Sequence, residues 1–102
     1  MRRGQVWKDA QHNYHLLVSD DSINKYSGFA VAIGITNKEV IRDDNTPGSS
    51  FTTYYQTGST QWPVVGLRLH VLKTKELIEQ VDQLETEEMA RVDAVLKAVL
   101  GL

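Results

Sequence analysis

The carboxy-terminal segment 86–102 carries the pattern that most constrains the fold of this chain. Its apolar residues recur at intervals of three and four, which places them on one face of a helix: Met89, Val92, Leu96 and Val99. Thr86 is a candidate amino-terminal cap, Glu87 and Glu88 add negative charge to the first turn, and Gly101 stands where a helix ends. An amphipathic helix needs a surface to cover. The residues before it resemble strands, so we expect the helix to close one side or end of a small sheet.

Short apolar runs alternate with turn-forming residues over the rest of the chain. Strand candidates lie at 5–8, 16–18, 29–35, 51–56 and 63–72. Segment 75–84 fits either a short helix or a turn followed by a strand at 80–84. Five or six short strands with a terminal helix predict a compact, partly open β-barrel.

Polar segments separate these strands. Segment 20–28 is rich in turn formers and has room for one helical turn, whereas 58–61 is typical of a hairpin turn. Segment 42–50 combines nearly every loop-forming residue type, which predicts an exposed connection. With 102 residues, 41% of them hydrophobic, and no repeat or linker, the sequence predicts a single domain over 1–102.

Composition excludes several classes of function. The net charge of −2 neither requires nor excludes a nucleic-acid partner, because groove binding depends on local charge. The absence of cysteine excludes a disulfide scaffold, a thiolate metal site and a cysteine nucleophile, and it fits a reducing compartment such as the cytoplasm. Segment 1–10 has two arginines but no apolar run, so we expect neither a secretion signal nor a membrane anchor.

Three segments carry a pattern that is more specific than composition. They read RRGQVW at 2–7, LLVSDDSINKYSG at 16–28 and VDQLETEEMARVDAVLKAVLGL at 81–102. In this order they resemble the MazF/PemK/Kid toxin family, and the resemblance covers most of the chain. It implies an SH3-like β-barrel with a C-terminal α-helix, usually a homodimer, encoded beside a small antitoxin protein. It also implies metal-independent cleavage of single-stranded RNA with no cofactor.

The resemblance assigns two positions of the active site and reveals one departure. Family members commonly have an arginine, in an R-P dipeptide, at the start of the second strand and a threonine or serine at the end of the third. Thr36 matches the latter, and its hydroxyl is suited to a phosphate oxygen. Asn13 and Tyr14 occupy the R-P position, and the loop before them is short. Loss of such a cation costs about 10²-fold in rate unless another group replaces it.

Histidines are the candidates for that replacement. His15 lies two residues after Asn13, so on a regular strand both side chains point the same way, and histidine exchanges protons near neutral pH. The predicted catalytic set is therefore Thr36, His15 and Asn13, with His12 and His70 as weaker candidates for the same role and for RNA contact. A histidine in a small domain is also often a hydrogen-bonded scaffold residue. The spacing of His12 and His15 does not align two metal ligands from a loop and a strand, so we predict no metal site.

Cations and aromatic rings complete the predicted RNA-binding set, because single-stranded RNA is held by charge and by stacking. Lys38 and Arg68 are candidates for phosphate contacts, and Tyr14 and Tyr55 for base contacts. Tyr54 and Tyr55 are neighbours on a predicted strand, so one of them faces away from the core, and the sequence does not decide which. An ordinary surface or core role fits each of these residues as well.

Three functions follow from these patterns. The leading one is an endoribonuclease toxin whose dimer groove binds single-stranded RNA and an antitoxin in competition. The alternative is a relative without catalysis that binds RNA or an antitoxin, since the arginine is missing. A poison of DNA gyrase comes last, because that toxin group shares the barrel but its usual carboxy-terminal ending is not visible.

Overall fold

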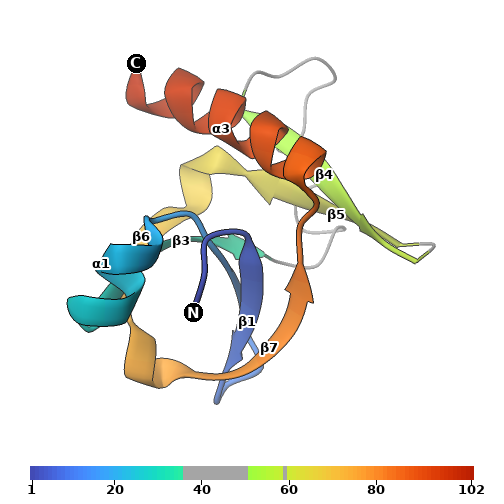
Figure 1. The fold of residues 1–102 in the computed structure, drawn as a ribbon. Coiled ribbons are helices and arrows are strands. Elements are labelled where there is room, and N and C mark those ends of the chain that lie inside the picture. The colour runs from blue at the N-terminus through green and yellow to red at the C-terminus, as the bar shows by residue number, and fades with distance from the viewer. Residues whose placement is uncertain (36–50, 59) are drawn as a thin grey trace.

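The structure is a computed structural model that describes residues 1–35, 51–58 and 60–102 (Figure 1). The strands among these residues are β1 (Gln5–Asp9), β2 (Tyr14–Leu17), β3 (Phe29–Ile35), β4 (Thr52–Thr57), β5 (Thr60–Val65), β6 (Leu69–Lys73) and β7 (Leu77–Gln83). The helices are α1 (Asp21–Tyr26) and α3 (Thr86–Leu100), and two 3₁₀ turns are η1 (Gly66–Arg68) and η2 (Thr74–Glu76).

Five strands form one antiparallel sheet, and β4 and β5 form a separate hairpin. The strand order of the sheet is β6-β3-β2-β1-β7, so β6 and β7 are its edge strands. Figure 1 shows the sheet curving into an open ring, with α3 and the hairpin together on its outside. The predicted mainly β fold with a C-terminal helix is confirmed, although the described residues form seven strands rather than five or six.

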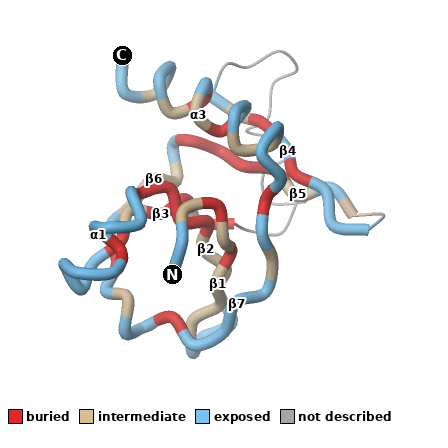
Figure 2. The backbone as a smooth tube through the Cα atoms, viewed as in Figure 1, coloured by how far each residue is buried: buried red, intermediate tan, exposed pale blue. Residues whose placement is uncertain are grey.

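Both faces of the curved sheet are buried. The larger hydrophobic cluster lies between the sheet and the layer of α3 and the hairpin: Val6, Leu16, Val18, Ile33, Ile35, Tyr55, Val64, Leu84 and Val92. The smaller cluster fills the concave face: Leu17, Ala30, Ala32, Leu72 and Leu77, with Trp7 packed against it. Figure 2 shows the buried residues concentrated along the strands. Leu16 and Leu17 join different clusters because successive residues of a strand point to opposite faces.

The predicted single strand at 63–72 is wrong. β5 ends at Val65, η1 turns the chain, and β6 starts at Leu69. The turn is needed because β5 pairs with β4 in the hairpin, whereas β6 pairs with β3 in the larger sheet. Segment 75–84 takes the second of its two predicted forms, a turn followed by a strand, but the strand begins earlier, at Leu77.

The terminal helix is confirmed with one change at its start. The residue that precedes the helix is Glu85, and Thr86 is the first helical residue rather than the cap. The Glu85 N–H donates to the Glu88 carboxylate at 2.9 Å, which satisfies a backbone donor at the helix start. Gly101 ends the helix in the left-handed conformation, with φ 72°, as its position predicted.

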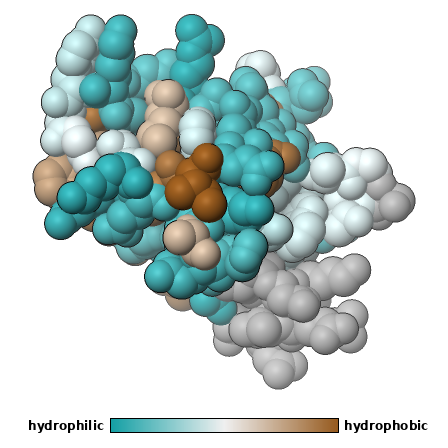
Figure 3. Space-filling model, turned by 90° about the horizontal axis from the view of Figure 1, so that it is seen from below, coloured by the Kyte–Doolittle hydropathy of each residue, from teal (hydrophilic) through white to brown (hydrophobic). Residues whose placement is uncertain are grey.

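Exposed apolar side chains come from several elements rather than from one surface. The most exposed include Tyr26 on α1, Leu67 in η1, Val71 on β6 and Ile78 on β7. The face seen in Figure 3 is mostly hydrophilic, with hydrophobic side chains as isolated spots. In the part of the chain that the structure describes, no helix has both the length and the apolar character needed to cross a membrane.

Gly66 lies beneath α3, where a side chain has no room. A Cβ atom at this position would lie 2.6 Å from Cγ1 of Val95 and 2.7 Å from Cγ2 of Val99. The Gly66 N–H also donates to the carbonyl of Phe51 at 2.8 Å, which holds the backbone in place. The missing side chain therefore sets how closely α3 approaches the strands.

We expect Gly66→Ala to lower the free energy of unfolding by about 1–3 kcal/mol, because an added methyl group overpacks the contact with α3. Equilibrium denaturation in urea measures the change. Gly34→Ala is the matched control, since the nearest atom to its Cβ would be Cε1 of His70 at an ordinary 3.7 Å. Equal destabilisation by both substitutions would contradict the role given to Gly66.

Candidate active site

Three ionisable side chains form a chain of hydrogen bonds where β1, β2 and β6 approach one another. Nε2 of His15 lies 2.9 Å from Oδ2 of Asp9, and Nδ1 of His15 lies 3.1 Å from Nε2 of His70. Nδ1 of His70 lies 3.0 Å from the carbonyl oxygen of Arg68. The two imidazole rings meet at 62°, with centroids 5.1 Å apart. We call Asp9, His15 and His70 the histidine cluster.

The register of the sheet brings the two histidines together across β3. His15 is paired with Gly34 of β3, and His70 is paired with Ala32 of the same strand. Gly34 has no side chain between the rings, and a Cβ there would lie at an ordinary 3.7 Å from Cε1 of His70. His15 also has the same strand parity as Leu17, so it points to the concave face. The cluster therefore lies at one end of the concave hydrophobic cluster.

Asp9 is held by the tight turn between β1 and β2. Its Oδ1 accepts the backbone N–H groups of Gln11 and Asn13, each at 2.9 Å. Its own N–H donates to the carbonyl of Asn13 at 2.9 Å. The second carboxylate oxygen faces His15, and both side chains are only 14% exposed. The short loop thus aims a carboxylate at the first histidine.

The ends of the cluster determine how many protons it needs. The Asp9 carboxylate and the Arg68 carbonyl only accept, so Nε2 of His15 and Nδ1 of His70 must each carry a hydrogen. A further hydrogen is needed between the two facing nitrogens. Two neutral imidazoles have only two N–H hydrogens. All the contacts are therefore hydrogen bonds only when the pair carries one excess proton.

The positive charge of that proton is best placed on His15. Its Nε2 faces the Asp9 carboxylate, so a charged His15 forms an ion pair at 2.9 Å. His70 faces a neutral carbonyl instead, which fixes its hydrogen on Nδ1 and leaves a lone pair on Nε2. In this state Nδ1 of His15 donates the hydrogen bond between the rings and Nε2 of His70 accepts it.

The surroundings of Asp9 favour its ionised form. Burial raises the pKa of the Asp9 carboxyl, but hydrogen bonds from His15 and from the backbone of Asn13 and Gln11 lower it by more. The net result is a pKa below the ordinary value of 3.8. The carboxylate therefore keeps the negative charge that a protonated His15 requires.

A depression of about 340 Å³ opens beside the cluster and along the edge strand β6. Its lining consists of His15, Phe29, His70, Val71, Leu72, Lys73 and Glu76. Both rings of the cluster are thus accessible from outside. A group that exchanges protons with a substrate needs this access.

Of the predicted site residues, the structure brings His15 and His70 together. His12 and Asn13 lie in the exposed turn between β1 and β2, where His12 has a φ of 66°. The contribution that the structure shows for Asn13 comes from its backbone, which binds Asp9. The catalytic role of the Asn13 side chain and the RNA contact of His12 stay predictions.

Two predicted residues belong to segment 36–50, which is outside the described residues: Thr36 and Lys38. Their predicted catalytic and RNA-binding roles stay predictions. Arg68 is half-buried at the end of η1 and contributes its carbonyl oxygen to the histidine cluster. The predicted phosphate contact concerns its side chain and also stays a prediction.

Tyr55 is a correction to the predicted RNA-binding set. It is 4% exposed and part of the larger hydrophobic cluster, whereas its neighbour Tyr54 is 37% exposed. Burial, with smaller contributions from nearby carboxylates, raises the pKa of the Tyr55 hydroxyl. The ring that the structure leaves exposed is therefore that of Tyr54 rather than that of Tyr55. Tyr14 packs edge-to-face against Trp62, with centroids 6.3 Å apart, and its RNA contact stays a prediction.

Three residues of this region are not among those predicted from the sequence: Asp9, Phe29 and Lys73. The signal for Asp9 was an aspartate followed by a short polar turn, a pattern in which the carboxylate binds backbone N–H groups. Phe29 and Lys73 are opposite each other in the pairing of β3 with β6. That proximity depends on register, for which the sequence has no local signal.

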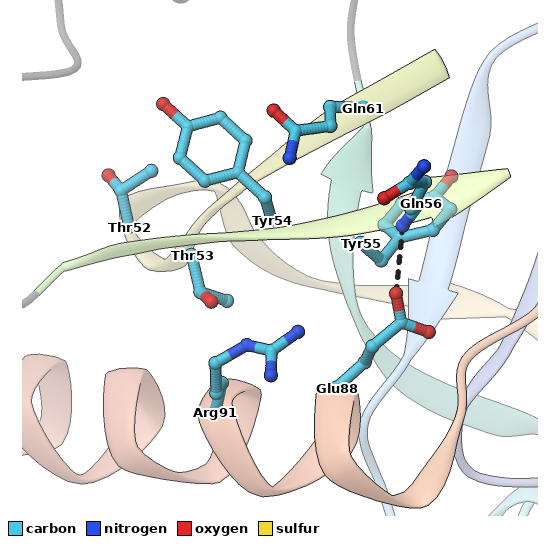
Figure 4. A pocket seen from close by; sticks show the side chains of 8 residues that line it. All are labelled: Thr52, Thr53, Tyr54, Tyr55, Gln56, Gln61, Glu88 and Arg91. Carbon is cyan, nitrogen blue, oxygen red and sulfur yellow. Dashed lines mark hydrogen bonds between the residues drawn. The ribbon is translucent and has the colours of Figure 1, made fainter. Parts of the chain in front are cut away.

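A second depression, of about 360 Å³, lies between β4 and α3 (Figure 4). Its lining residues are Thr52, Thr53, Tyr54, Tyr55, Gln56, Gln61, Glu88 and Arg91. Figure 4 shows Glu88 and Arg91 reaching from α3 towards β4, and the Glu88 carboxylate accepts the Gln56 N–H at 2.8 Å. This bond fastens the hairpin to the helix. None of these lining residues form a pair like that of His15 and His70, so we place the candidate active site at the histidine cluster.

The donor atoms of the cluster serve hydrogen bonds rather than a metal ion. Metal binding needs imidazole lone pairs, whereas both ring nitrogens of His15 face hydrogen-bonding partners. No group of three or more His, Cys, Asp or Glu in the ranges 1–35, 51–58 and 60–102 is arranged to hold a metal.

Comparison with known proteins reveals a similarity of structure. No family model and no curated protein matches the chain. An endoribonuclease from a mycobacterial species superposes with a TM-score of 0.82 at 19% identity, over 100% of this chain and 92% of that chain. A mycobacterial endoribonuclease in complex with its cognate antitoxin also gives 0.82 at 19%, over 100% and 96%. A MazE-MazF complex from Deinococcus radiodurans gives 0.77 at 17%, over 99% and 96%. The chain therefore has the fold of the MazF endoribonuclease toxins.

We expect Asp9→Asn to destabilise the fold by about 1–3 kcal/mol near pH 6, because the charged hydrogen bond to His15 is lost. The folded pKa of Asp9 is lowered, so its stabilisation is complete above about pH 4 and is lost as the pH falls through the folded value. The difference between wild type and variant should therefore shrink at acid pH. Urea denaturation between about pH 2.5 and 6 tests this.

Glu79→Gln is the control for that titration, since Glu79 is an exposed carboxylate that pairs with Lys8 at the surface. Its effect should be below about 1 kcal/mol. If Asp9→Asn destabilised the fold equally at every pH, the negative charge of Asp9 would not be the source of the stabilisation.

Proposed function

We propose that this chain is the toxin of a toxin–antitoxin module and that it cleaves single-stranded RNA without a metal ion. The observation that carries the proposal is the contact between His15 and His70, with Asp9 behind it, in a fold shared with endoribonuclease toxins. RNA cleavage through the 2′-hydroxyl needs one base and one acid on opposite sides of a phosphate. The cluster supplies one of each.

In the proposed reaction the substrate separates the two facing nitrogens. Nε2 of His70 takes the proton of the 2′-hydroxyl, and the 2′-oxygen forms a bond to phosphorus. The bond from phosphorus to the 5′-oxygen breaks, and Nδ1 of His15 gives its proton to that oxygen. The products are a 2′,3′-cyclic phosphate and a 5′-hydroxyl end. Reprotonation of His15 and deprotonation of His70 restore the starting state.

The protonated His15 also replaces the cation that the family pattern places at Asn13. A positive charge beside the phosphate stabilises the negative charge that develops during attack. Asp9 keeps this charge on His15 and orients its ring through the 2.9 Å contact. Thr36 and Asn13 stay in the proposal as donors to phosphate oxygens, on the basis of the family resemblance alone.

The proposed partners follow from the same resemblance and from the similar structures. Two of those structures hold a toxin with an antitoxin, so we propose a small antitoxin protein as the inhibitor of this chain. A homodimer in the cytoplasm is the assembly and location that we propose.

A second function has one observation in its favour. Asn13 stands where the family pattern has its arginine. A chain that lost catalysis with that residue would still bind RNA or an antitoxin. The two functions differ in whether the purified chain cuts RNA.

We expect the purified chain to cut single-stranded RNA in the presence of a chelator and to leave 2′,3′-cyclic phosphate ends. His15→Ala and His70→Ala should each lower the rate by about 10²-fold or more, the usual effect of removing a general acid or base. The rate should show a bell-shaped dependence on pH, because one histidine must be protonated and the other neutral. Gel electrophoresis of labelled RNA gives the rates and the end chemistry.

Lys97→Ala is the control, since it removes a positive charge on the exposed surface of α3, far in sequence from the cluster. Urea denaturation should confirm that each histidine variant is folded. Absence of cutting from a sequence-diverse RNA pool would favour the binding function. Full activity of the folded His15→Ala variant would remove the histidine mechanism.

A further inference from the structure

The depression beside the histidine cluster contains an aromatic ring and a cation that the proposed chemistry does not use. Phe29 begins the inner strand β3 and is 47% exposed, although its neighbour Ala30 is fully buried. Lys73 ends β6 and is exposed, and no described residue forms an ion pair with it. Both residues line the same depression as His15 and His70.

The strand pairing places Phe29 and Lys73 side by side. They are directly opposite in the antiparallel pair of β3 and β6, so their side chains leave the sheet on the same face. Lys73 follows His70 by three residues, an odd number, so the two side chains leave β6 on opposite faces, about 10 Å apart along the strand. The depression reaches both because β6 is an edge strand, so Phe29 and Lys73 line its outer side and the histidine rings line its concave side.

One nucleotide of single-stranded RNA matches this set of groups. Aromatic side chains hold unpaired bases by stacking, and ammonium groups hold phosphates. The volume of about 340 Å³ is at the lower end of the range for ligand sites, which suits a nucleotide and is too small for a helix. The Glu76 carboxylate on the rim repels phosphate, so the Lys73 ammonium marks the phosphate position.

We infer that this depression is a nucleotide subsite in which a base stacks on Phe29 and a phosphate binds Lys73. The inference rests on the proposed endoribonuclease function, and it names residues that position the RNA rather than react with it. Substitutions of Phe29 and Lys73 should therefore raise KM and leave kcat unchanged.

Binding of an RNA oligonucleotide with 2′-O-methyl groups, which cannot be cleaved, tests the subsite by fluorescence anisotropy. Phe29→Leu keeps an apolar side chain but removes stacking, so it should weaken binding about 10-fold. Phe29→Trp should bind at least as tightly as the wild type. Because Trp and Leu both preserve an apolar residue, their difference reports stacking rather than folding.

Charge substitutions give a second and independent readout. Lys73→Gln should weaken binding and lower the slope of log affinity against log salt by about 0.7, the value for one phosphate contact to a single strand. Glu76→Gln should strengthen binding, since it removes a negative charge from the rim. The opposite signs of these two effects place the phosphate in this depression.

Two matched controls lie outside the depression. Tyr26→Leu removes a ring that is 77% exposed on α1, and Lys97→Gln removes an exposed cation on α3. Both should bind the oligonucleotide as the wild type does.

The outcomes separate this inference from the proposed function. Wild-type affinity in Phe29→Leu and Lys73→Gln overturns the subsite, while loss of cleavage in His15→Ala still supports the nuclease. Weaker binding in both variants of a chain that never cuts RNA supports the subsite and overturns the nuclease. A wild-type chain that neither binds nor cuts RNA overturns both.

Discussion

The structure depends on the burial of both faces of one short, curved sheet. On the outer face α3 and the β4–β5 hairpin cover a cluster that includes Leu16 and Ile33. On the concave face the strands supply their own cover, and small side chains such as Ala30 and Ala32 leave the space for this. Neither the β4–β5 hairpin nor α3 would be stable alone, because a hairpin or a single amphipathic helix buries too little apolar surface in water. The curvature of the sheet and the position of α3 on its outer face therefore both serve the burial of apolar side chains.

The histidine cluster lies where the concave face stops being apolar. Partly buried polar groups are costly unless they are hydrogen-bonded, and each polar atom from Asp9 to the Arg68 carbonyl has a partner. The same bonds that satisfy the groups also require an excess proton on the pair. In the proposed mechanism the same arrangement supplies the acid and the base that the substrate then separates.

The short loop between β1 and β2 positions Asp9 in the histidine cluster. It is too short to carry the longer segment of the family pattern, and Asn13 stands in place of the arginine. Its four-residue turn, 10–13, holds Asp9 through two backbone N–H groups and aims the carboxylate at His15. In the proposed mechanism the protonated His15 takes the place of the arginine of the family pattern. The depression beside the cluster is also lined by Phe29 and Lys73.

The sequence by itself determined the local elements. The helix at 86–100, the strand at 29–35 and the hairpin around Gly58 follow from periodicity and turn residues, which act over a few positions. The pattern of short strands and a terminal helix predicted a partly open β-barrel, the family resemblance implied the same fold class, and residue chemistry pointed to His15. Only the tertiary structure decided that His15 meets His70, 55 positions away, and that Tyr55 rather than Tyr54 is buried. Such contacts depend on strand register and on which face the core covers, and these are set by the packing of the whole chain rather than by neighbouring residues.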